Sequence, residues 1–244
     1  MLTTIIQLVL SLTLAGPTPK ADPPAEVFLL IGQSNMAGRA ELIDQDTQPI
    51  PRVWLLNDHA TWEPASQPLN RYASDHKGAK FQRFNLGGPF ATALTNQDTN
   101  QTVGLIVNAR GGTTIDQWLH GQDLYQHTLE RIRAQDNIHL AGILWHQGES
   151  NRDDPDYGSK LKQLITALRN DLNQPDLPFI AGHISGENTI NSQMDDLKDK
   201  LPTYAVVQAD GLTLFDGIHY DRKSLITLGR RYAMAYQAMV SQTK

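Results

Sequence analysis

Short apolar runs alternate with longer segments of helical periodicity along most of this chain. The runs are 27–31, 103–109, 141–145, 178–183 and 204–208. Runs of this length, bounded by polar turns and separated by amphipathic segments, are typical of buried strands joined by crossover helices. The pattern therefore predicts an α/β fold with a five-stranded, doubly wound parallel sheet.

Two of the intervening segments have a clear helical pattern. Residues 157–172 carry one apolar stripe, which predicts a crossover helix between the third and fourth strands. Its apolar residues are Leu161, Leu164, Ile165, Leu168 and Leu172. Residues 224–240 repeat this spacing, so we expect the chain to close with a helix packed on the sheet.

One stretch departs from the alternation. Residues 42–88 are rich in Pro, Asn, Asp and Gly and contain several aromatic residues. We interpret this stretch as an insertion above the sheet. The chain has 244 residues and shows no internal repeat, so we expect one domain, residues 26–244.

The amino-acid composition of the chain limits both its structural class and the molecules that it could bind. The 40% of hydrophobic residues are enough for a sizeable core, and the chain contains no cysteine for disulfides or thiolate metal sites. The net charge is -5 and no run of Lys or Arg occurs. This charge pattern argues against nucleic acids and anionic membranes as partners, because both attract basic patches.

The N-terminal residues have the features of a targeting segment. The sequence MLTTIIQLVLSLTLAG is apolar but too short to cross a bilayer comfortably, and a Pro-rich spacer follows it. We expect residues 1–25 to be a signal peptide and spacer, and the protein to be secreted or periplasmic. Because residues 1–6 contain no Lys or Arg, a plain N-terminal extension is the alternative.

Ligands of open α/β sheets bind beyond the carboxyl ends of the strands, and a small-residue turn follows the first apolar run. In this turn, GQSNMAG at 32–38, Ser34 would stand at the start of a helix. Free backbone N–H groups at that point would favour an oxyanion beside the serine. An ordinary helix cap would leave the same pattern, so Ser34 needs support from other segments.

That support comes from the segment before the last helix. There Asp216 and His219 stand three residues apart, and a serine nucleophile needs both a base and an acid that orients the base. The other seven histidines lack such a partner at close spacing, so we expect them to be surface or structural residues. A metal site made of His146, Glu149 and His219 is an alternative, although no HExxH spacing supports it.

Two further strand ends carry more polar or flexible residues than a turn needs. Paired glycines, 111 and 112, follow the second run and would let the backbone approach a ligand. The cluster HQGESN follows the third run at 146–151. In it Glu149 could serve as a general acid or base, or could fix neighbouring loops by hydrogen bonds.

Together these segments resemble the SGNH hydrolase superfamily, in particular its carbohydrate acetylesterases of the acetylxylan esterase and sialate O-acetylesterase types. The matching motifs are GQSNM at 32–36, ARGGTTI at 109–115, WHQGES at 145–150 and DGIH at 216–219. Four separated motifs in the same order are far more specific than any one alone. The resemblance implies a flavodoxin-like, three-layer α/β/α sandwich.

The resemblance also implies roles for individual residues. Ser34 would be the nucleophile, His219 the general base and Asp216 the residue that orients it. The oxyanion hole would consist of the N–H groups of Ser34 and Gly112 and the side-chain amide of Gln147, with Asn35 as an alternative amide donor. We expect the remaining strand-end polar residues, Gln33, Asn35 and Glu149, to bind substrate or support the site.

The implied activity is a serine esterase that removes acetyl groups from carbohydrate through an acyl-enzyme, with no metal or organic cofactor. Its partner would be an acetylated carbohydrate, without nucleic acid or stable membrane insertion. A lipid or thioester hydrolase on the same fold is one alternative. A non-catalytic carbohydrate-binding protein is another, in which Trp54, Trp62 and Trp118 would stack on sugars. A phosphate-binding loop at 32–40 is disfavoured because the lysine of that motif is missing.

Overall fold

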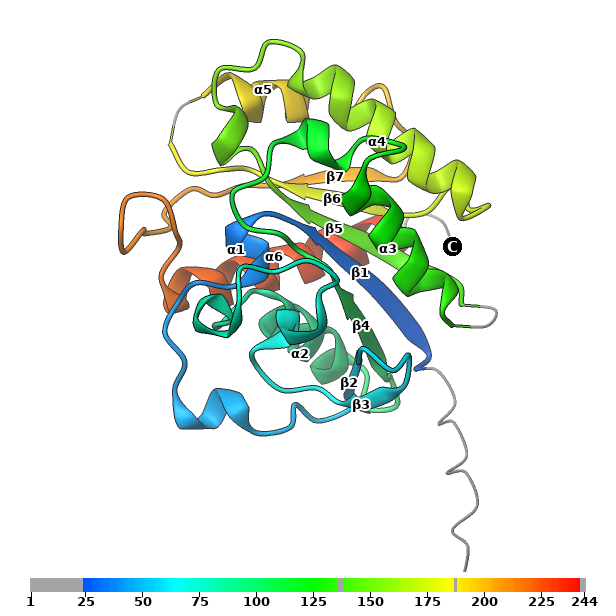
Figure 1. Cartoon of the computed structure of the whole chain (residues 1–244), viewed down its shortest axis with the longest axis vertical. Coiled ribbons are helices and arrows are strands. Elements are labelled where there is room, and N and C mark those ends of the chain that lie inside the picture. Colours follow the sequence, from blue (N-terminus) through cyan, green and yellow to red (C-terminus); the bar gives the residue numbers. More distant parts are fainter. Residues whose placement is uncertain (1–23, 136–137, 187, 242–244) are drawn as a thin grey trace, which may run out of the picture.

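A seven-stranded sheet with helices on both faces forms the centre of the molecule (Figure 1). The computed structural model describes residues 24–135, 138–186 and 188–241, so nearly all of the predicted signal peptide and spacer lies outside the described residues. The strands are β1 Glu26–Gly32, β2 Val53–Leu56, β3 Trp62–Pro64, β4 Val103–Val107, β5 Leu140–His146, β6 Phe179–Gly182 and β7 Tyr204–Val207. Their order is β3-β2-β4-β1-β5-β6-β7, and neighbouring strands are parallel except for β2 and β3.

Six α-helices and five 3-10 turns connect the strands in the described part of the chain. The α-helices are α1 Ser34–Ala37, α2 Gly87–Gln97, α3 Asp123–Arg133, α4 Tyr157–Asp171, α5 Thr189–Asp195 and α6 Arg222–Ser241. The 3-10 turns are η1 Asp44–Thr47, η2 Leu69–Tyr72, η3 Ala79–Phe81, η4 Ile115–Trp118 and η5 Glu149–Asn151. None of these described helices is long and apolar enough to span a bilayer.

The predicted doubly wound α/β/α architecture is confirmed, but the predicted count of five strands is wrong. The two additional strands, β2 and β3, come from the segment 42–88, for which the sequence predicts an insertion above the sheet. Both strands are short, with four and three residues, so neither produces a long apolar run. Part of this segment therefore extends the edge of the sheet, and β3 ends that edge as an antiparallel strand.

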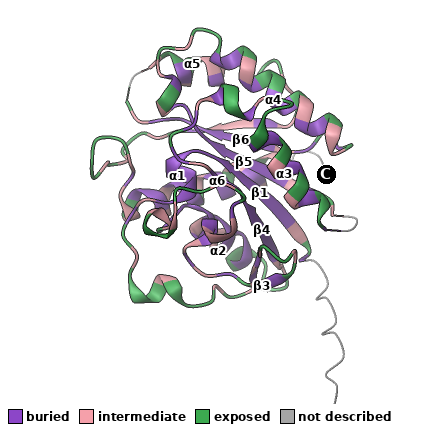
Figure 2. Ribbon diagram, viewed as in Figure 1, coloured by how far each residue is buried: buried purple, intermediate pink, exposed green. Residues whose placement is uncertain are grey.

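The first strand shows why the sheet needs helices on both faces. Along β1, Val27, Leu29 and Ile31 point into one hydrophobic core, whereas Phe28 and Leu30 point into the other. All five residues are buried, and Figure 2 shows that burial continues across the sheet while the outer helix faces are exposed. Each such side chain stabilises the fold by about 1.5–3 kcal/mol.

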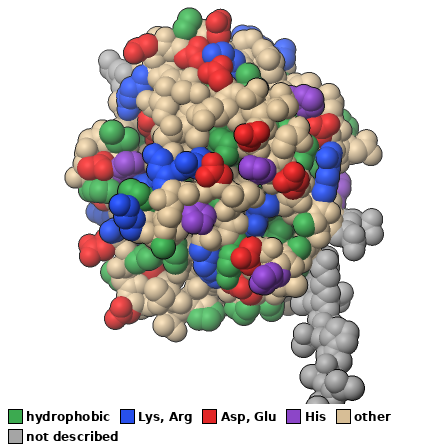
Figure 3. Space-filling model, in the orientation of Figure 1, with side chains coloured by type: hydrophobic (Ala, Val, Ile, Leu, Met, Phe, Trp, Pro, Cys, Tyr) green, Lys and Arg blue, Asp and Glu red, His purple; other side chains and the backbone are tan. Residues whose placement is uncertain are grey.

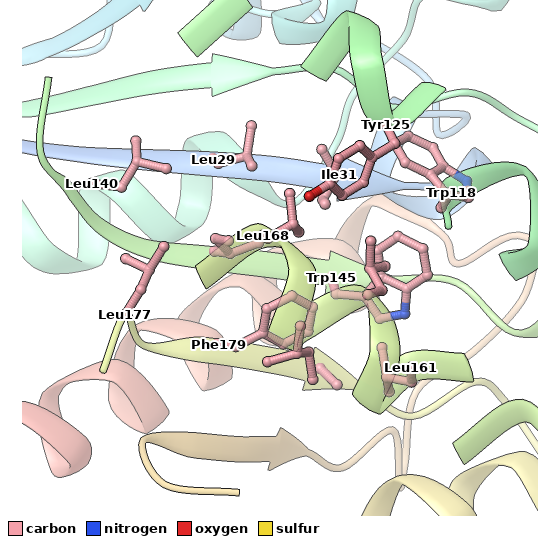
Figure 4. Packing of buried hydrophobic residues seen from close by; sticks show 14 of the residues in the cluster. Leu29, Ile31, Trp118, Tyr125, Leu140, Trp145, Leu161, Leu168, Leu177 and Phe179 are labelled. Atoms are coloured by element: carbon pink, nitrogen blue, oxygen red, sulfur yellow. The ribbon is translucent and has the colours of Figure 1, made fainter. Parts of the chain in front are cut away.

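The amphipathic helix α4 covers the first of these cores. Figure 4 shows Leu161 and Leu168 of α4 above the sheet residues Trp145 and Phe179, with Leu29 in the adjoining strand. Helix α6 covers the opposite face, where Leu225 and Leu228 belong to the second core. The two helices expected from the sequence thus lie on opposite faces of the sheet, as a doubly wound fold requires.

The chain changes its winding direction at β1, and this change positions the site. From β1 the chain passes to β2, β3 and β4 on one side of the sheet, and then to β5, β6 and β7 on the other. The carboxyl ends of β4 and β5 therefore flank the end of β1, which is the usual ligand position in such sheets. At this end Gly32 has a φ of 133°, and a Cβ there would lie 2.2 Å from the His146 carbonyl oxygen. Only glycine allows β1 and β5 to approach each other so closely.

Candidate active site

Ser34 lies two residues after the end of β1, at the edge of the sheet where the chain changes its winding direction. The backbone N–H of Gln33 donates to the His146 carbonyl at 2.9 Å, and Ser34 then begins α1. The side chain of Ser34 lies in a crevice, since the residue is only 5% exposed. Because α1 has just four residues, it contributes little macrodipole. What it offers is the N–H of Ser34, which has no hydrogen-bond acceptor among the described residues.

The loop between β7 and α6 brings the predicted base and acid to this serine. His219 Nε2 lies 2.9 Å from Ser34 Oγ, and His219 Nδ1 lies 2.6 Å from Asp216 Oδ2. In Figure 1 this loop projects beside α1, at the same edge of the sheet. The hydroxyl, imidazole and carboxylate therefore form one continuous chain of hydrogen bonds, although 185 residues separate Ser34 from His219.

The carboxylate of Asp216 is held in its charged form. Its Oδ1 accepts the backbone N–H groups of Ile218 at 3.0 Å and His219 at 2.7 Å, while its Oδ2 faces the imidazole. Burial acts to raise the pKa of Asp216, but these hydrogen bonds outweigh it and hold the pKa at about 2. A charged Asp216 accepts a hydrogen bond from Nδ1, which leaves Nε2 of His219 able to accept the Ser34 hydroxyl.

The paired glycines of the β4 loop lie against the serine. A Cβ on Gly111 would lie 3.5 Å from Ser34 Cβ, in ordinary van der Waals contact, and 2.4 Å from Arg39 Nη2, so a side chain here would require the Arg39 guanidinium to move. Gly112 follows with a φ of 76° and is exposed. In the described ranges its N–H has no backbone acceptor. The turn can thus present a free N–H next to the nucleophile.

Gln147, the predicted side-chain donor of the oxyanion hole, lies in a buried network. Its Nε2 lies within hydrogen-bond distance of three acceptors: Gln33 Oε1 at 3.1 Å, the Thr113 carbonyl at 3.0 Å and Asn151 Oδ1 at 2.7 Å. A primary amide has two N–H groups, so these acceptors already occupy it. The oxyanion role of Gln147 stays a prediction, and it would require the amide to leave this network.

The other predicted supporting residues lie behind the serine and bind protein groups. Gln33 Oε1 accepts from Gln147 and from the N–H of Ser150 at 3.4 Å, so Gln33 joins the ends of β1 and β5. Asn35 is buried and donates to Glu149 Oε1 at 2.5 Å. The Glu149 side chain is 5% exposed, which fits the interpretation of this carboxylate as a residue that fixes neighbouring loops.

The expectation that the other histidines lack an acid at close spacing is wrong for His146 and also for His59, whose Nε2 lies 3.8 Å from Asp58 Oδ1. His146 has an acid at close spacing after all, because Glu149 lies three residues further along and its Oε1 is 3.9 Å from His146 Nε2. Burial lowers the pKa of His146, which is completely enclosed. Within the described ranges no group of three or more His, Cys, Asp and Glu side chains is arranged to hold a metal ion.

A cleft beside the catalytic loop, the segment between β7 and α6 that carries the proposed catalytic residues Asp216 and His219, was not expected from the sequence. It has a volume of about 590 Å³ and is lined by Arg39, Arg83 and Phe215 together with the acids Glu41 and Asp221. The Phe215 ring is 54% exposed and stacks on the His219 ring, with centroids 5.9 Å apart and planes at 26°. The position of Phe215 next to the DGIH motif was the one available signal, but neither its exposure nor its stacking can be read from sequence.

Comparisons with known proteins agree with this fold. Residues 24–238 match the family described as carbohydrate esterase, sialic acid-specific acetylesterase. A probable carbohydrate esterase of Arabidopsis thaliana, At4g34215, is 32% identical over 239 residues, covering 88% of this chain and 91% of that protein. The X-ray structure of At4g34215 has a TM-score of 0.78 at 31% identity and covers 88% of this chain and 99% of that one.

Two more distant structures share the fold alone. NanS has a TM-score of 0.70 at 16% identity, with coverage of 91% of this chain and 100% of that one. A carbohydrate acetylesterase from Xanthomonas citri has a TM-score of 0.64 at 19% identity, with coverage of 89% and 57%. The fold and these relatives define a carbohydrate esterase class built on an SGNH-like α/β/α sandwich. The chain belongs to the sialic acid-specific acetylesterase family of carbohydrate esterases.

Proposed function

We propose that this protein is a serine esterase that removes O-linked acetyl groups from carbohydrate. The observation that carries the proposal is the continuous hydrogen-bonded chain from Ser34 through His219 to Asp216, with lengths of 2.9 and 2.6 Å. Such a chain supplies a nucleophile, a base and an orienting acid, which are the groups that acyl transfer to serine requires. A non-catalytic carbohydrate-binding protein would have no use for this arrangement.

Acylation uses the hydroxyl and the imidazole of this chain. His219 Nε2 takes the proton of Ser34 Oγ as this oxygen attacks the ester carbonyl carbon. The tetrahedral intermediate then collapses, the bond to the sugar oxygen breaks, and this oxygen takes the proton from His219. Deacylation repeats the steps with water as nucleophile and releases acetate and free Ser34.

Negative charge develops on the carbonyl oxygen during both steps. The N–H groups of Ser34 and Gly112 are the supported donors for it, since both lack acceptors in the described part of the chain. Donors fixed in place before the reaction stabilise such charge without having to reorganise, and each typically contributes about 2.7–4 kcal/mol. A side-chain donor from Gln147 would add to them only after a rearrangement of its network.

The charged side chains and the exposed ring at the mouth of the site are compatible with a sugar substrate. The cleft next to His219 combines charged side chains, among them Arg39 and Arg83, with a single exposed aromatic ring, Phe215. Near the place where the catalytic loop projects in Figure 1, Figure 3 shows Lys and Arg side chains next to Asp or Glu, His and hydrophobic side chains. Polar groups and one ring face suit a hydroxyl-rich ring, whereas a long acyl chain needs a continuous apolar channel.

The proposed function is tested with Ser34→Ala. Wild type should release 4-nitrophenol from 4-nitrophenyl acetate, and the variant should lose more than about 10³-fold of kcat/KM while its thermal unfolding changes little. Acetate should also appear from acetylated xylan or O-acetyl sialic acid faster than long-chain esters are cleaved. Retained turnover by the variant would refute the serine mechanism, and a preference for long chains would assign the protein to the lipid hydrolases.

A further inference from the structure

The catalytic loop is shaped by its own hydrogen bonds, but these do not set its distance from Ser34. The N–H of Phe215 donates to the His219 carbonyl at 3.0 Å, and the N–H of Asp221 donates to the Thr213 carbonyl at 3.1 Å. The loop therefore forms a small hairpin before α6. The contacts that decide whether His219 reaches Ser34 must come from outside this hairpin.

Asn35, the residue next to the nucleophile, provides these contacts. Its Nδ2 donates to the Ile218 carbonyl at 3.2 Å, and its Oδ1 accepts the N–H of Tyr220 at 3.0 Å. One side chain thus binds the backbone on both sides of His219. Because Asn35 directly follows Ser34 in α1, it fixes the base relative to the nucleophile.

The carboxylate of Glu149 selects the orientation of this amide. Glu149 Oε1 accepts from Asn35 Nδ2 at 2.5 Å, and a carboxylate can only accept. If the amide were turned over, its oxygen would face both Glu149 and the Ile218 carbonyl, and its NH2 group would face the N–H of Tyr220. Asn35 is 1% exposed, so water could not relieve these conflicts.

We propose that Glu149 is a positioning residue, which acts through Asn35 to hold His219 at bonding distance from Ser34. Its effect on activity rests on the proposed esterase function, whereas its effect on the geometry does not. The ring of Tyr220 is fully buried beside His146, with centroids 5.7 Å apart, and keeps the loop attached to the body of the protein. The burial of Tyr220 therefore keeps the loop folded against the protein, whereas the hydrogen bond between Glu149 and Asn35 sets the exact position of His219 relative to Ser34.

The test is a double-mutant cycle with Asn35→Asp and Glu149→Gln, assayed with 4-nitrophenyl acetate. Asn35→Asp places two carboxylates against each other and should lower kcat about 100-fold with KM nearly unchanged, because small misplacements of a base cost about that much. Glu149→Gln alone should lower kcat about tenfold. In the double variant the new amide at position 149 can donate to the new carboxylate at position 35, but that carboxylate still faces the Ile218 carbonyl, so kcat should recover only in part, by about tenfold relative to Asn35→Asp.

Multiplied losses in the double variant, or a raised KM with unchanged kcat in Glu149→Gln, would overturn the proposal, because Glu149 would then act on the substrate or independently of Asn35. Thr213→Val is the matched control. It removes hydrogen bonds to Asp221 and Ser224 at the base of the same loop, without touching Asn35, and should leave kcat within about twofold.

Crystal structures of the variants separate this inference from the proposed function. In Asn35→Asp the distance from Ser34 Oγ to His219 Nε2 should exceed about 3.5 Å, and in the double variant it should be shorter than in Asn35→Asp, although the carboxylate at position 35 still repels the Ile218 carbonyl. Unchanged distances in all variants would refute the positioning role. If wild type cleaves no ester, the proposed function fails, and these distances still decide the role of Glu149.

Discussion

The two halves of the catalytic arrangement are built in opposite ways. Ser34 belongs to a buried region in which side chains such as Gln33 and Gln147 join the ends of three strands. Asp216 and the nearby Ile218 lie in an exposed hairpin, and hydrogen bonds from Asn35 hold this hairpin in place. The sheet fixes Ser34, the proposed nucleophile, whereas a few hydrogen bonds fix His219, the proposed base. Substitution of a buried side chain that only joins the strand ends, such as Gln147, should therefore cost stability, whereas substitution of a hairpin side chain should cost rate.

The largest effect on the hairpin side is expected from Asp216→Asn. An asparagine can donate to Nδ1 of His219 and so favours the wrong tautomer, which should lower kcat/KM about 10³–10⁴-fold. The midpoint of thermal unfolding should change little, since the Asp216 side chain is 40% exposed. Steady-state kinetics and a melting curve check both parts.

Glu41→Gln is the control for this change, because Glu41 lines the neighbouring cleft without contacting His219. It should retain kcat with 4-nitrophenyl acetate within about twofold. If Asp216→Asn were as active as wild type, Asp216 would not orient the base. The expectation that hairpin substitutions lower the rate would then be wrong.

On the buried side, Gln147→Ala tests the opposite expectation. It leaves the acceptors on Gln33, Thr113 and Asn151 without their donor, so the free energy of unfolding should fall by about 2–4 kcal/mol. Urea denaturation measures this loss. Gln126→Ala, at an exposed position of α3, should change stability by less than about 0.5 kcal/mol.

The same variant also tests the oxyanion role expected from the family resemblance. If Gln147 donates to the oxyanion, kcat should fall about 10²–10³-fold in Gln147→Ala even where the protein remains fully folded. A stable variant with that kinetic loss would show that the amide leaves its network during catalysis. A destabilised variant with nearly normal kcat would assign Gln147 to the buried region alone.

The sequence patterns were sufficient to predict the central strands of the sheet. The five apolar runs became β1, β4, β5, β6 and β7, because buried parallel strands are apolar on both faces and stand out from polar turns. The same patterns placed Ser34 and the pair Asp216 and His219 after strand ends. Since strand ends meet at one edge, local signals could predict a juxtaposition across 185 residues.

Features that depend on tertiary contact could not be read in this way. The strands β2 and β3 are too short and mixed to give a periodic signal, and they form because β2 pairs with β4 and β3 pairs with β2. The partners of Asn35 lie on distant segments, so its polar side chain suggested only a general supporting role. The spacing of His146 and Glu149 equals that of Asp216 and His219, and the two pairs are distinguished only by tertiary structure: the first is enclosed, whereas His219 of the second contacts Ser34.

A smaller effect is expected from Phe215→Ala in the hairpin. Loss of an exposed aromatic face beside His219 should raise KM for acetylated xylan oligomers about 2–10-fold, which corresponds to about 0.5–1.5 kcal/mol of ring contact. Turnover of 4-nitrophenyl acetate, which carries no sugar, should stay within about threefold. Met234→Ala on α6, also an exposed apolar residue, is the control and should alter neither substrate. Equal losses on both substrates would show that Phe215 supports His219 rather than the sugar.

The smallest effect concerns the pH dependence of stability. The folded-state pKa of Asp216 is lowered to about 2, so its charged form is favoured by folding. A lowered carboxyl pKa contributes stability above the ordinary range for aspartate, near 4, and loses it as the pH falls towards 2. Because the side chain is 40% exposed, solvent screens this contribution, and wild type should exceed Asp216→Asn by less than about 1 kcal/mol at neutral pH. The difference should shrink below about pH 4 and disappear below about pH 2, as measured by urea denaturation across the pH range. A difference that grew on acidification would mean that folding favours the protonated carboxyl, and the hairpin would then have to hold His219 by contacts other than an ion pair.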